Sequence, residues 1–387
     1  MLITTSDALA EFCAALRGAP YIAVDTEFLR EKTYRAQLCL VQVAYGEHAA
    51  AIDPLAPDLD LGPLRDLLHD RATVKVLHAA TQDLEIFLDK TGSVPGPIFD
   101  TQIAASVCGL GEQPGYAALV EKMAGVHIDK ASQATDWSVR PLSERQLDYA
   151  LSDVTHLCVV YERLVARLEE TGRTSWIAED MTALEDPTRY RVEPRDAWRR
   201  VRIRRAKPKT LAVLRELAAW REETAVQRNL PRKWVMKDEV LVEVAQNLPE
   251  DAETLTRVRG LPARVAKGPD GAAMLAAMAV GVACPEADWP DAAPRRKRLV
   301  GHEPLVALLQ ALLQLRCDAH DVAPAIVARR ADLDRIATED EPDVAALEGW
   351  RRRVFGADAL ALCAGELALT ADHGVVLAVK PGETPAR

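Results

Sequence analysis

The chain has 387 residues, with 58 acidic and 48 basic side chains and a formal net charge of −10. This length predicts two or three domains. A hydrophobic content of 49% with 27% charged residues excludes a disordered chain and indicates a protein that buries real cores. The negative net charge does not favour a nucleic-acid partner. Phosphate binding, however, depends on local basic patches rather than on net charge.

The seven cysteines are scattered and none forms a CxxC pair. This pattern argues against a zinc site or a disulfide framework and favours a reducing compartment. No apolar run is long enough to span a bilayer, and the N-terminal segment lacks the basic-then-apolar order of a secretory signal. We therefore expect a cytoplasmic protein without a membrane partner.

Strand-like and helix-like segments alternate in the first part of the chain, which predicts an α/β domain. Ser143 with Gln146 three residues later predicts the N-terminus of a long helix. The expected strands are 21–24, 37–45, 49–52 and 74–78, and the expected helices are 64–69, 81–88, 101–108, 116–123 and 143–170.

The composition changes near Asp186. A strongly basic run covers 195–209, and the pattern after it is helical throughout. A proline-rich break at 285–298 precedes a third segment, expected to be helical from 303 to 369, and a tail expected to fray after Lys380. The predicted parts are an α/β domain at 1–180, a basic linker at 181–206, and helical domains at 207–286 and 299–375.

Asp25 and Glu27 lie two residues apart at the end of the first expected strand, in the sequence VDTEF. Alternate residues of a strand point to the same face, so both carboxylates share one face. Two such carboxylates beside a buried strand are costly unless a cation holds them, and Mg²⁺ prefers carboxylate oxygens. A solvated strand end is the alternative, and a single D-x-E pattern does not separate the two.

Two further stretches carry acidic residues. Asp83 falls in the first turn of a helix, where the helix dipole alone would favour it. Tyr149 and Asp153 are four residues apart on the long helix and therefore share a face. An exposed aspartate beside a core tyrosine would explain that pair equally well, so each pattern alone is weak.

The order of the three motifs is more specific than any one of them. A D-x-E strand, a helix-start aspartate and a late Y-x-x-x-D helix resemble the DEDD exonucleases, in the branch that has tyrosine in the third motif. The segments VDTEF, VLHAATQDLEIF, FDTQIAAS and DWSVRPLSERQLDYALSDVTHL resemble ribonuclease D. This resemblance implies a ribonuclease H-like fold and 3′→5′ exoribonuclease activity that releases nucleoside 5′-monophosphates. It also implies two divalent ions, Mg²⁺ or Mn²⁺, held by Asp25, Glu27, Asp83 and Asp153, with Tyr149 orienting or helping to deprotonate the attacking water.

The sequence of residues 210–261 resembles the HRDC module, a small helical bundle associated with nucleic-acid binding. The segments AAWREETAVQRNLPRKWVMKDEVLVEVA and LTRVRGLP carry this resemblance. The expected fold is thus an α/β ribonuclease H-like exonuclease domain followed by two all-α HRDC-like bundles, the second matching less clearly. Structural roles would explain the candidate RNA-binding residues equally well. They are Trp137, Arg140, Arg204, Arg205, Arg228, Arg232 and Lys233.

The resemblance implies that the partners are RNA 3′ ends, tRNA precursors among them, and that the protein is a monomer. A DNA exonuclease of the same superfamily is an alternative, because both nucleic acids present the same phosphate. A catalytically inactive RNA-binding scaffold is a second alternative. The absence of one of the metal-ligating residues would indicate it. All four acidic positions and the tyrosine are present, which argues against the scaffold.

Overall fold

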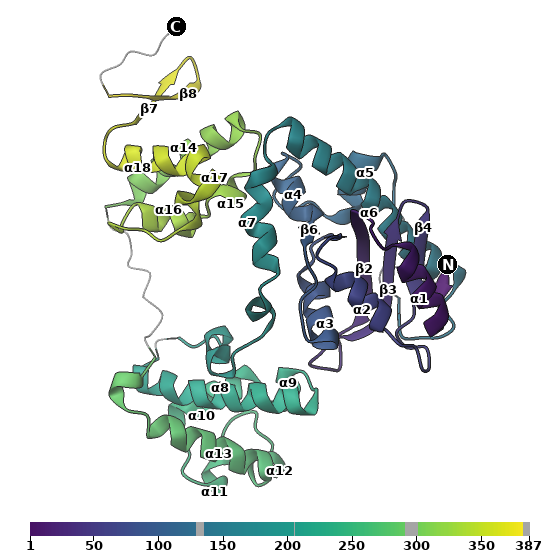
Figure 1. Cartoon of the computed structure of the whole chain (residues 1–387). Helices are drawn as coiled ribbons and strands as arrows, with labels where there is room; N and C mark the ends of the chain where they lie inside the picture. Colours follow the sequence, from purple (N-terminus) through teal and green to yellow (C-terminus); the bar gives the residue numbers. More distant parts are fainter. Residues whose placement is uncertain (129–134, 205, 291–300, 382–387) are drawn as a thin grey trace. The chain divides into compact units, whose positions relative to one another are not determined.

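The computed structural model describes residues 1–128, 135–204, 206–290 and 301–381. The chain forms two compact units (Figure 1). Unit 1 comprises Met1–Glu27, Cys39–Asp186 and Arg298–Arg387, and unit 2 comprises Phe28–Leu38 and Pro187–Lys297. None of the helices in the described ranges is long and apolar enough to cross a membrane.

Unit 1 contains a six-stranded mixed sheet in the order β1-β4-β3-β2-β5-β6. Parallel pairing joins β2 to β5 and β5 to β6, whereas β3 and β4 form an antiparallel pair. The strands are β1 (Leu2–Ile3), β2 (Tyr21–Leu29), β3 (Gln37–Tyr45), β4 (His48–Ile52), β5 (Val74–Leu77) and β6 (Ile98–Asp100). The helices of this part are α1 (Ser6–Ala15), α2 (Gly62–His69), α3 (Thr81–Thr91), α4 (Thr101–Val107), α5 (Tyr116–Ala124), α6 (Glu144–Glu170) and α7 (Thr174–Leu184).

The long helix α6 packs on one face of the sheet and brings its side chains to β2. The predicted capping box is confirmed, because the Ser143 hydroxyl accepts from the backbone N–H of Gln146 and the Gln146 side chain accepts from the backbone N–H of Ser143. On β2, the Tyr21 hydroxyl donates to Glu162 of α6 at 2.6 Å. Since alternate strand residues share a face, positions 23, 25 and 27 point to the same side as Tyr21.

The C-terminal part of unit 1 docks on α7. The indole rings of Trp176 and Trp350 stack with centroids 4.6 Å apart, and Arg351 pairs with Asp180 at 2.9 Å. The elements of this part are α14 (Glu303–Ala319), α15 (Pro324–Val327), α16 (Arg330–Ile336), α17 (Gly349–Arg351), α18 (Ala357–Cys363), β7 (Ala368–Asp372) and β8 (Val375–Val379).

Unit 2 is a helical bundle with a core of its own. Gly281 lets two of its helices approach closely, because a Cβ at that position would lie 2.5 Å from the Val213 Cα. The helices are η2 (Pro187–Tyr190), η3 (Pro194–Arg200), α8 (Pro208–Arg228), α9 (Arg232–Val235), α10 (Asp238–Asn247), α11 (Ala252–Leu255), α12 (Ala263–Ala266), α13 (Pro269–Val282) and η4 (Glu286–Asp288).

The segment Phe28–Leu38, which joins β2 to β3, belongs to unit 2. The Tyr34 hydroxyl donates to Glu222 of α8, and the Arg232 guanidinium lies 4.7 Å from the centroid of the Tyr34 ring. Glu222 is 1% exposed and also accepts from Arg232 at 2.5 and 2.6 Å. The polypeptide that leaves β2 is therefore held by α8 and α9.

Three features differ from the sequence analysis. The short strands β1 and β6 and the helix α1 were not expected. The hairpin β7–β8 contradicts an all-α third part, because its residues pair in an antiparallel register from Ala368↔Val379 to Asp372↔Val375. The stretch expected to be a basic linker is folded, because η3 packs on α8 and inserts Trp198 into the core of unit 2.

Replacing Arg232 by leucine should destabilise unit 2. The change leaves the buried Glu222 carboxylate without its main cation, which costs roughly 3 kcal/mol for a buried pair. Native-state hydrogen exchange of the α8 and α9 amides measures this loss within a multidomain chain. Arg264→Leu, at an exposed position of the same unit, is the matched control. Equal protection in both variants would contradict a stabilising role for this pair.

Candidate active site

Asp25 and Glu27 lie within β2 and face α6. Both side chains are half-buried. One carboxylate oxygen from each lies within 4.8 Å of the other and of an oxygen of Asp153. The two-residue spacing of the strand thus brings two acidic groups to one point, as the sequence predicts.

Tyr149 and Asp153 lie one turn apart on α6. Apolar neighbours Ala150 and Val154 are fully buried and fix the helix against the sheet. Asp153 is only 5% exposed, and its Oδ1 has no hydrogen-bond partner among the described residues. Burial and the charge of Asp25 raise the pKa of Asp153, and the nearby Tyr149 hydroxyl lowers it in part. The carboxylate is therefore buried beside Tyr149 with one oxygen left unsatisfied.

Asp83 lies in the first turn of α3 and is 8% exposed. The Thr26 hydroxyl, between the two acidic residues of β2, donates to Asp83 Oδ1 at 2.5 Å. Asp83 is not part of the close group of three carboxylates, yet its charge acts on both Asp25 and Glu27. It thus stands beside the group at the same end of the strand.

The loop before α3 is fixed by Asp100. Its carboxylate accepts from the backbone N–H groups of Ala79 and Ala80, at 3.1 and 2.9 Å. It also caps α4 by accepting from the Gln102 N–H at 2.8 Å. Ala79 has a φ of 55°, a left-handed conformation that these bonds stabilise. Asp100 thereby positions the start of α3 and Asp83.

Burial raises the pKa of all four carboxylates, and the charges of neighbouring carboxylates raise the pKa of Glu27, Asp83 and Asp153 further. Burial, and then repulsion from Asp25, Asp153 and Asp83, raises the pKa of Glu27 to about 9. Burial and the charge of Asp25 raise the pKa of Asp153 to about 7. Burial also raises the pKa of Asp25, and burial with the charge of Asp25 raises that of Asp83. Four ionised groups at this point require positive charge nearby.

A divalent cation fits this donor set. Oxygen ligands about 2.1 Å from one Mg²⁺ lie roughly 3–4 Å from each other. The three carboxylate oxygens lie within 4.8 Å of one another, so a small adjustment would let them share an ion. The unsatisfied buried oxygen of Asp153 supplies a ligand that no protein group in the described ranges uses. Hard carboxylate oxygens without cysteine or histidine favour Mg²⁺ or Mn²⁺ over zinc.

The carboxylates open into a cleft of about 380 Å³. Tyr116, which the sequence analysis did not single out, lines it at the start of α5 and donates through its hydroxyl to the Asp153 backbone carbonyl. His78 lines the same cleft, with Nδ1 3.0 Å from the Thr101 hydroxyl. The remaining lining residues are Asp25, Thr26, Glu27, Gly115, Ala117, Ala118, Ile128, Tyr149, Asp153 and Leu157.

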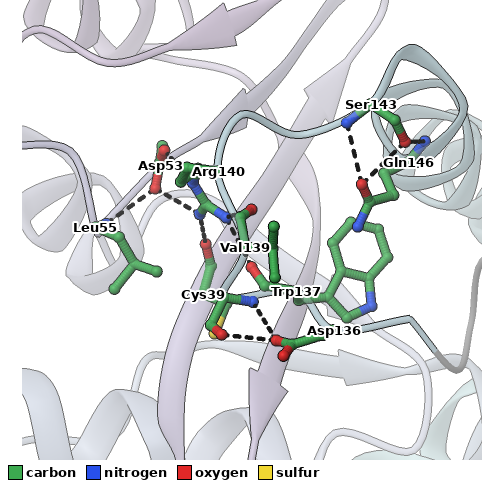
Figure 2. Close-up of polar contacts among 10 residues, drawn as sticks. Cys39, Asp53, Leu55, Asp136, Trp137, Val139, Arg140, Ser143 and Gln146 are labelled. Carbon is green, nitrogen blue, oxygen red and sulfur yellow. Dashed lines mark hydrogen bonds and ion pairs between the residues drawn. The ribbon is translucent and has the colours of Figure 1, made fainter.

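Trp137 and Arg140, expected to contact RNA, are held inside the protein (Figure 2). The Arg140 guanidinium donates to both carboxylate oxygens of Asp53 at 2.6 and 2.7 Å and to the Cys39 carbonyl. Trp137 is 2% exposed, with its ring centroid 6.2 Å from that of Tyr149. Both side chains therefore fix the loop before α6, and this geometry gives no support to RNA contact.

The expected RNA-binding residues of unit 2 separate into two groups. Arg228 forms a bidentate pair with Asp270 at 2.5 and 3.0 Å, and Arg232 is bound to Glu222, so both have structural partners. Arg204 and Lys233 are exposed. Arg205 lies outside the described residues.

Raising the pH should destabilise the metal-free protein. Because folding raises these carboxyl pKa values, the protonated groups stabilise the fold at low pH, and this contribution is lost as the pH passes about 7 to 9. Glu27→Gln should therefore raise the stability of the metal-free protein at pH 9 by roughly 2 kcal/mol, allowing for partial exposure.

Thermal unfolding with EDTA and with Mg²⁺ measures this effect. Mg²⁺ should stabilise the wild type more than the variant, because ligand binding to the folded state raises stability. Glu11→Gln, at an exposed position of α1, is the matched control. Identical pH dependence in wild type and Glu27→Gln would contradict the mutual repulsion.

The comparisons with known proteins agree with this geometry. The 3′-5′ exonuclease family matches residues 1–169, and the HRDC domain family matches 210–278. Ribonuclease D of Granulibacter bethesdensis is 50% identical over 384 residues, covering 98% of this chain and 97% of that protein. Ribonuclease D of Gluconacetobacter diazotrophicus is 48% identical over 375 residues, covering 96% and 95%.

A solved structure extends the likeness to the whole fold. It is that of Escherichia coli RNase D, described as an exoribonuclease involved in structured RNA processing. The two chains superpose with a TM-score of 0.81 at 33% identity, covering 94% of this chain and 98% of the other. The motifs, the carboxylate cluster and these matches together show that the chain belongs to the ribonuclease D family of 3′→5′ exoribonucleases.

Proposed function

We propose that this exoribonuclease removes nucleotides from RNA 3′ ends by hydrolysis with two divalent ions, Mg²⁺ or Mn²⁺, and releases nucleoside 5′-monophosphates. The observation that carries the proposal is the convergence of Asp25, Glu27 and Asp153 within 4.8 Å, with Asp83 beside them. Two ions in such a site activate water and stabilise the leaving oxygen. Asp25, Glu27 and Asp153 would hold one ion, and Asp25 and Asp83 the other.

Tyr149 orients the attacking water. Burial, and then the charge of Asp153, raises the pKa of its hydroxyl above the ordinary value of about 10. The hydroxyl therefore stays protonated at neutral pH, and it acts by hydrogen bonding rather than as a general base. Tyr149 and Asp153 line the same cleft, which places the hydroxyl beside a carboxylate that would bind the ions.

The substrates we propose are structured RNAs with free 3′ ends, tRNA precursors among them. Support comes from unit 2, because residues 187–297 contain 23 lysines and arginines against 15 acidic residues in a chain of net charge −10. A basic surface of this kind binds phosphate backbones. Exposed Arg204 and Lys233 are the proposed phosphate contacts among the expected residues.

Further aspects of this function rest on the organisation of the chain. We propose domain limits of 1–180 for the exonuclease domain and of 207–286 and 299–375 for the helical domains, and an HRDC-like origin for the helices of the last part. A monomer acting in the cytoplasm fits the seven cysteines, which are all free. Burial raises the pKa of several thiols, Cys13 to about 11, which keeps them protonated and unreactive.

The decisive assay follows RNA with a structured 3′ end, and DNA of the same sequence, at nucleotide resolution. Wild-type protein with Mg²⁺ should shorten the RNA stepwise from the 3′ end, and EDTA should stop the reaction. Asp153→Asn should lose detectable turnover and keep RNA binding, because it removes a metal ligand outside the basic surface. Asp148→Asn, an exposed acid on the same helix, is the matched control and should stay active.

Other outcomes of this assay would reject the proposal in distinguishable ways. Shortening of DNA alone would keep the chemistry and reject the substrate. Binding without shortening of either nucleic acid would indicate an inactive scaffold. Full activity of Asp153→Asn would reject the assigned site.

A further inference from the structure

Trp234 is the only one of the seven tryptophans with an exposed side chain. Its side chain is 61% exposed, whereas Trp137, Trp198 and Trp350 are at most 7% exposed and the other three are half-buried. The residue lies on α9, in the helical bundle of unit 2 (Figure 1). A large aromatic surface in water is available to a ligand that can cover it.

The residues on both sides of Trp234 are anchored, so the exposed ring is presented from a fixed support. Val235 and Met236 are buried, and Met236 belongs to the core of unit 2. Arg232, two residues before, is held by the buried carboxylate of Glu222 and by the ring of Tyr34. The backbone N–H of Trp234 itself donates to the Pro231 carbonyl at 2.8 Å. Little ordering is then required when a ligand binds.

Two cations flank the ring. Lys233 precedes Trp234 and Lys237 follows it by three residues, and both are exposed. Neither forms an ion pair with any residue in the described ranges, whereas Asp238 next to Lys237 is paired with Arg221 at 2.5 Å. The surface thus combines an open aromatic face with uncompensated cations.

These features select one class of ligand. A nucleobase stacks on an exposed indole, and the adjoining phosphates are attracted by flanking lysines. Bases in a duplex are already stacked on each other, so a single strand is the form that exposes them. We infer that Trp234, Lys233 and Lys237 form a stacking platform for a base of single-stranded RNA, which rests on the proposed action on RNA.

Binding of a short fluorescein-labelled oligouridine to the full chain tests this platform. Fluorescence anisotropy in EDTA measures affinity without hydrolysis. Trp234→Ala should weaken binding by roughly 5- to 100-fold, the effect of losing one base–aromatic stack, and Trp234→Phe should retain most of the affinity. Val280→Ala, at a 58% exposed apolar position of the same unit, is the matched control and should bind as wild type does.

An abasic oligonucleotide of the same length separates stacking from charge. Trp234→Ala should bind it as tightly as the wild type does, because no base is present to stack. Lys233→Ala and Lys237→Ala should weaken both ligands, each lowering the salt dependence of binding by about 0.7 in slope. Wild-type affinity of Trp234→Ala for oligouridine, or an equal loss on the abasic ligand, would overturn the platform.

The same variants distinguish failure of the platform from failure of the proposed function. Stepwise shortening of RNA by wild-type protein in Mg²⁺, together with unchanged binding in Trp234→Ala, would reject the platform alone. Absence of shortening by the wild type would reject the proposed function, whatever the binding result.

Discussion

The burial and mutual repulsion of four neighbouring carboxylates is the constraint on which the site depends. Ionised groups at the positions of Asp25, Glu27, Asp83 and Asp153 destabilise each other, so the fold must hold them together against that force. A different structural element or contact holds each carboxylate in position. β2 aligns the first two by its two-residue repeat, Asp83 is bound by Thr26, and α6 carries Asp153.

This arrangement explains why the surrounding structure is rigid. Asp100 ties the loop before α3 through backbone amides, and the Arg140–Asp53 pair ties the loop before α6. Neither residue belongs to the carboxylate group, yet each fixes an element that carries one of its members. Protonation relieves this repulsion at low pH, and bound divalent cations would relieve it at higher pH, so that the stability of unit 1 and its chemistry would depend on the same ions.

The distribution of charge reconciles an acidic chain with an RNA substrate. The excess of lysine and arginine in 187–297 is confined to unit 2, while the rest of the chain is strongly acidic. The segment Phe28–Leu38 continues directly from β2, which carries Asp25 and Glu27, and is bound within unit 2 through Tyr34 and Arg232. The polypeptide thereby links the strand that carries Asp25 and Glu27 to unit 2.

The sequence predicted the features that depend on local spacing. The D-x-E pair, the Y-x-x-x-D pair and the Ser143 capping box follow from strand and helix periodicity, and the structure has all three. Strands of two and three residues, β1 and β6, are too short to show a period.

The partners of several charged residues lie too far along the chain to be predicted from spacing. Arg140 and Asp53 are 87 residues apart in sequence, and Arg232 and Tyr34 are 198 apart. Both arginines were candidates for RNA contact, with a structural role as an equal alternative, because nothing local reveals an internal partner. Thr26 lies between Asp25 and Glu27, and its position on the opposite strand face was the available sign that it could reach another element.

Counting Mn²⁺ ions bound to the protein tests the central claim most directly. Electron paramagnetic resonance titration of metal-free wild-type protein should give two Mn²⁺ per chain, and Asp25→Asn, which removes the ligand common to both ions, should weaken both sites. The Asp148→Asn variant should bind as the wild type does. Failure of the wild type to bind Mn²⁺, or unchanged binding by Asp25→Asn, would contradict a cluster assembled to hold divalent cations.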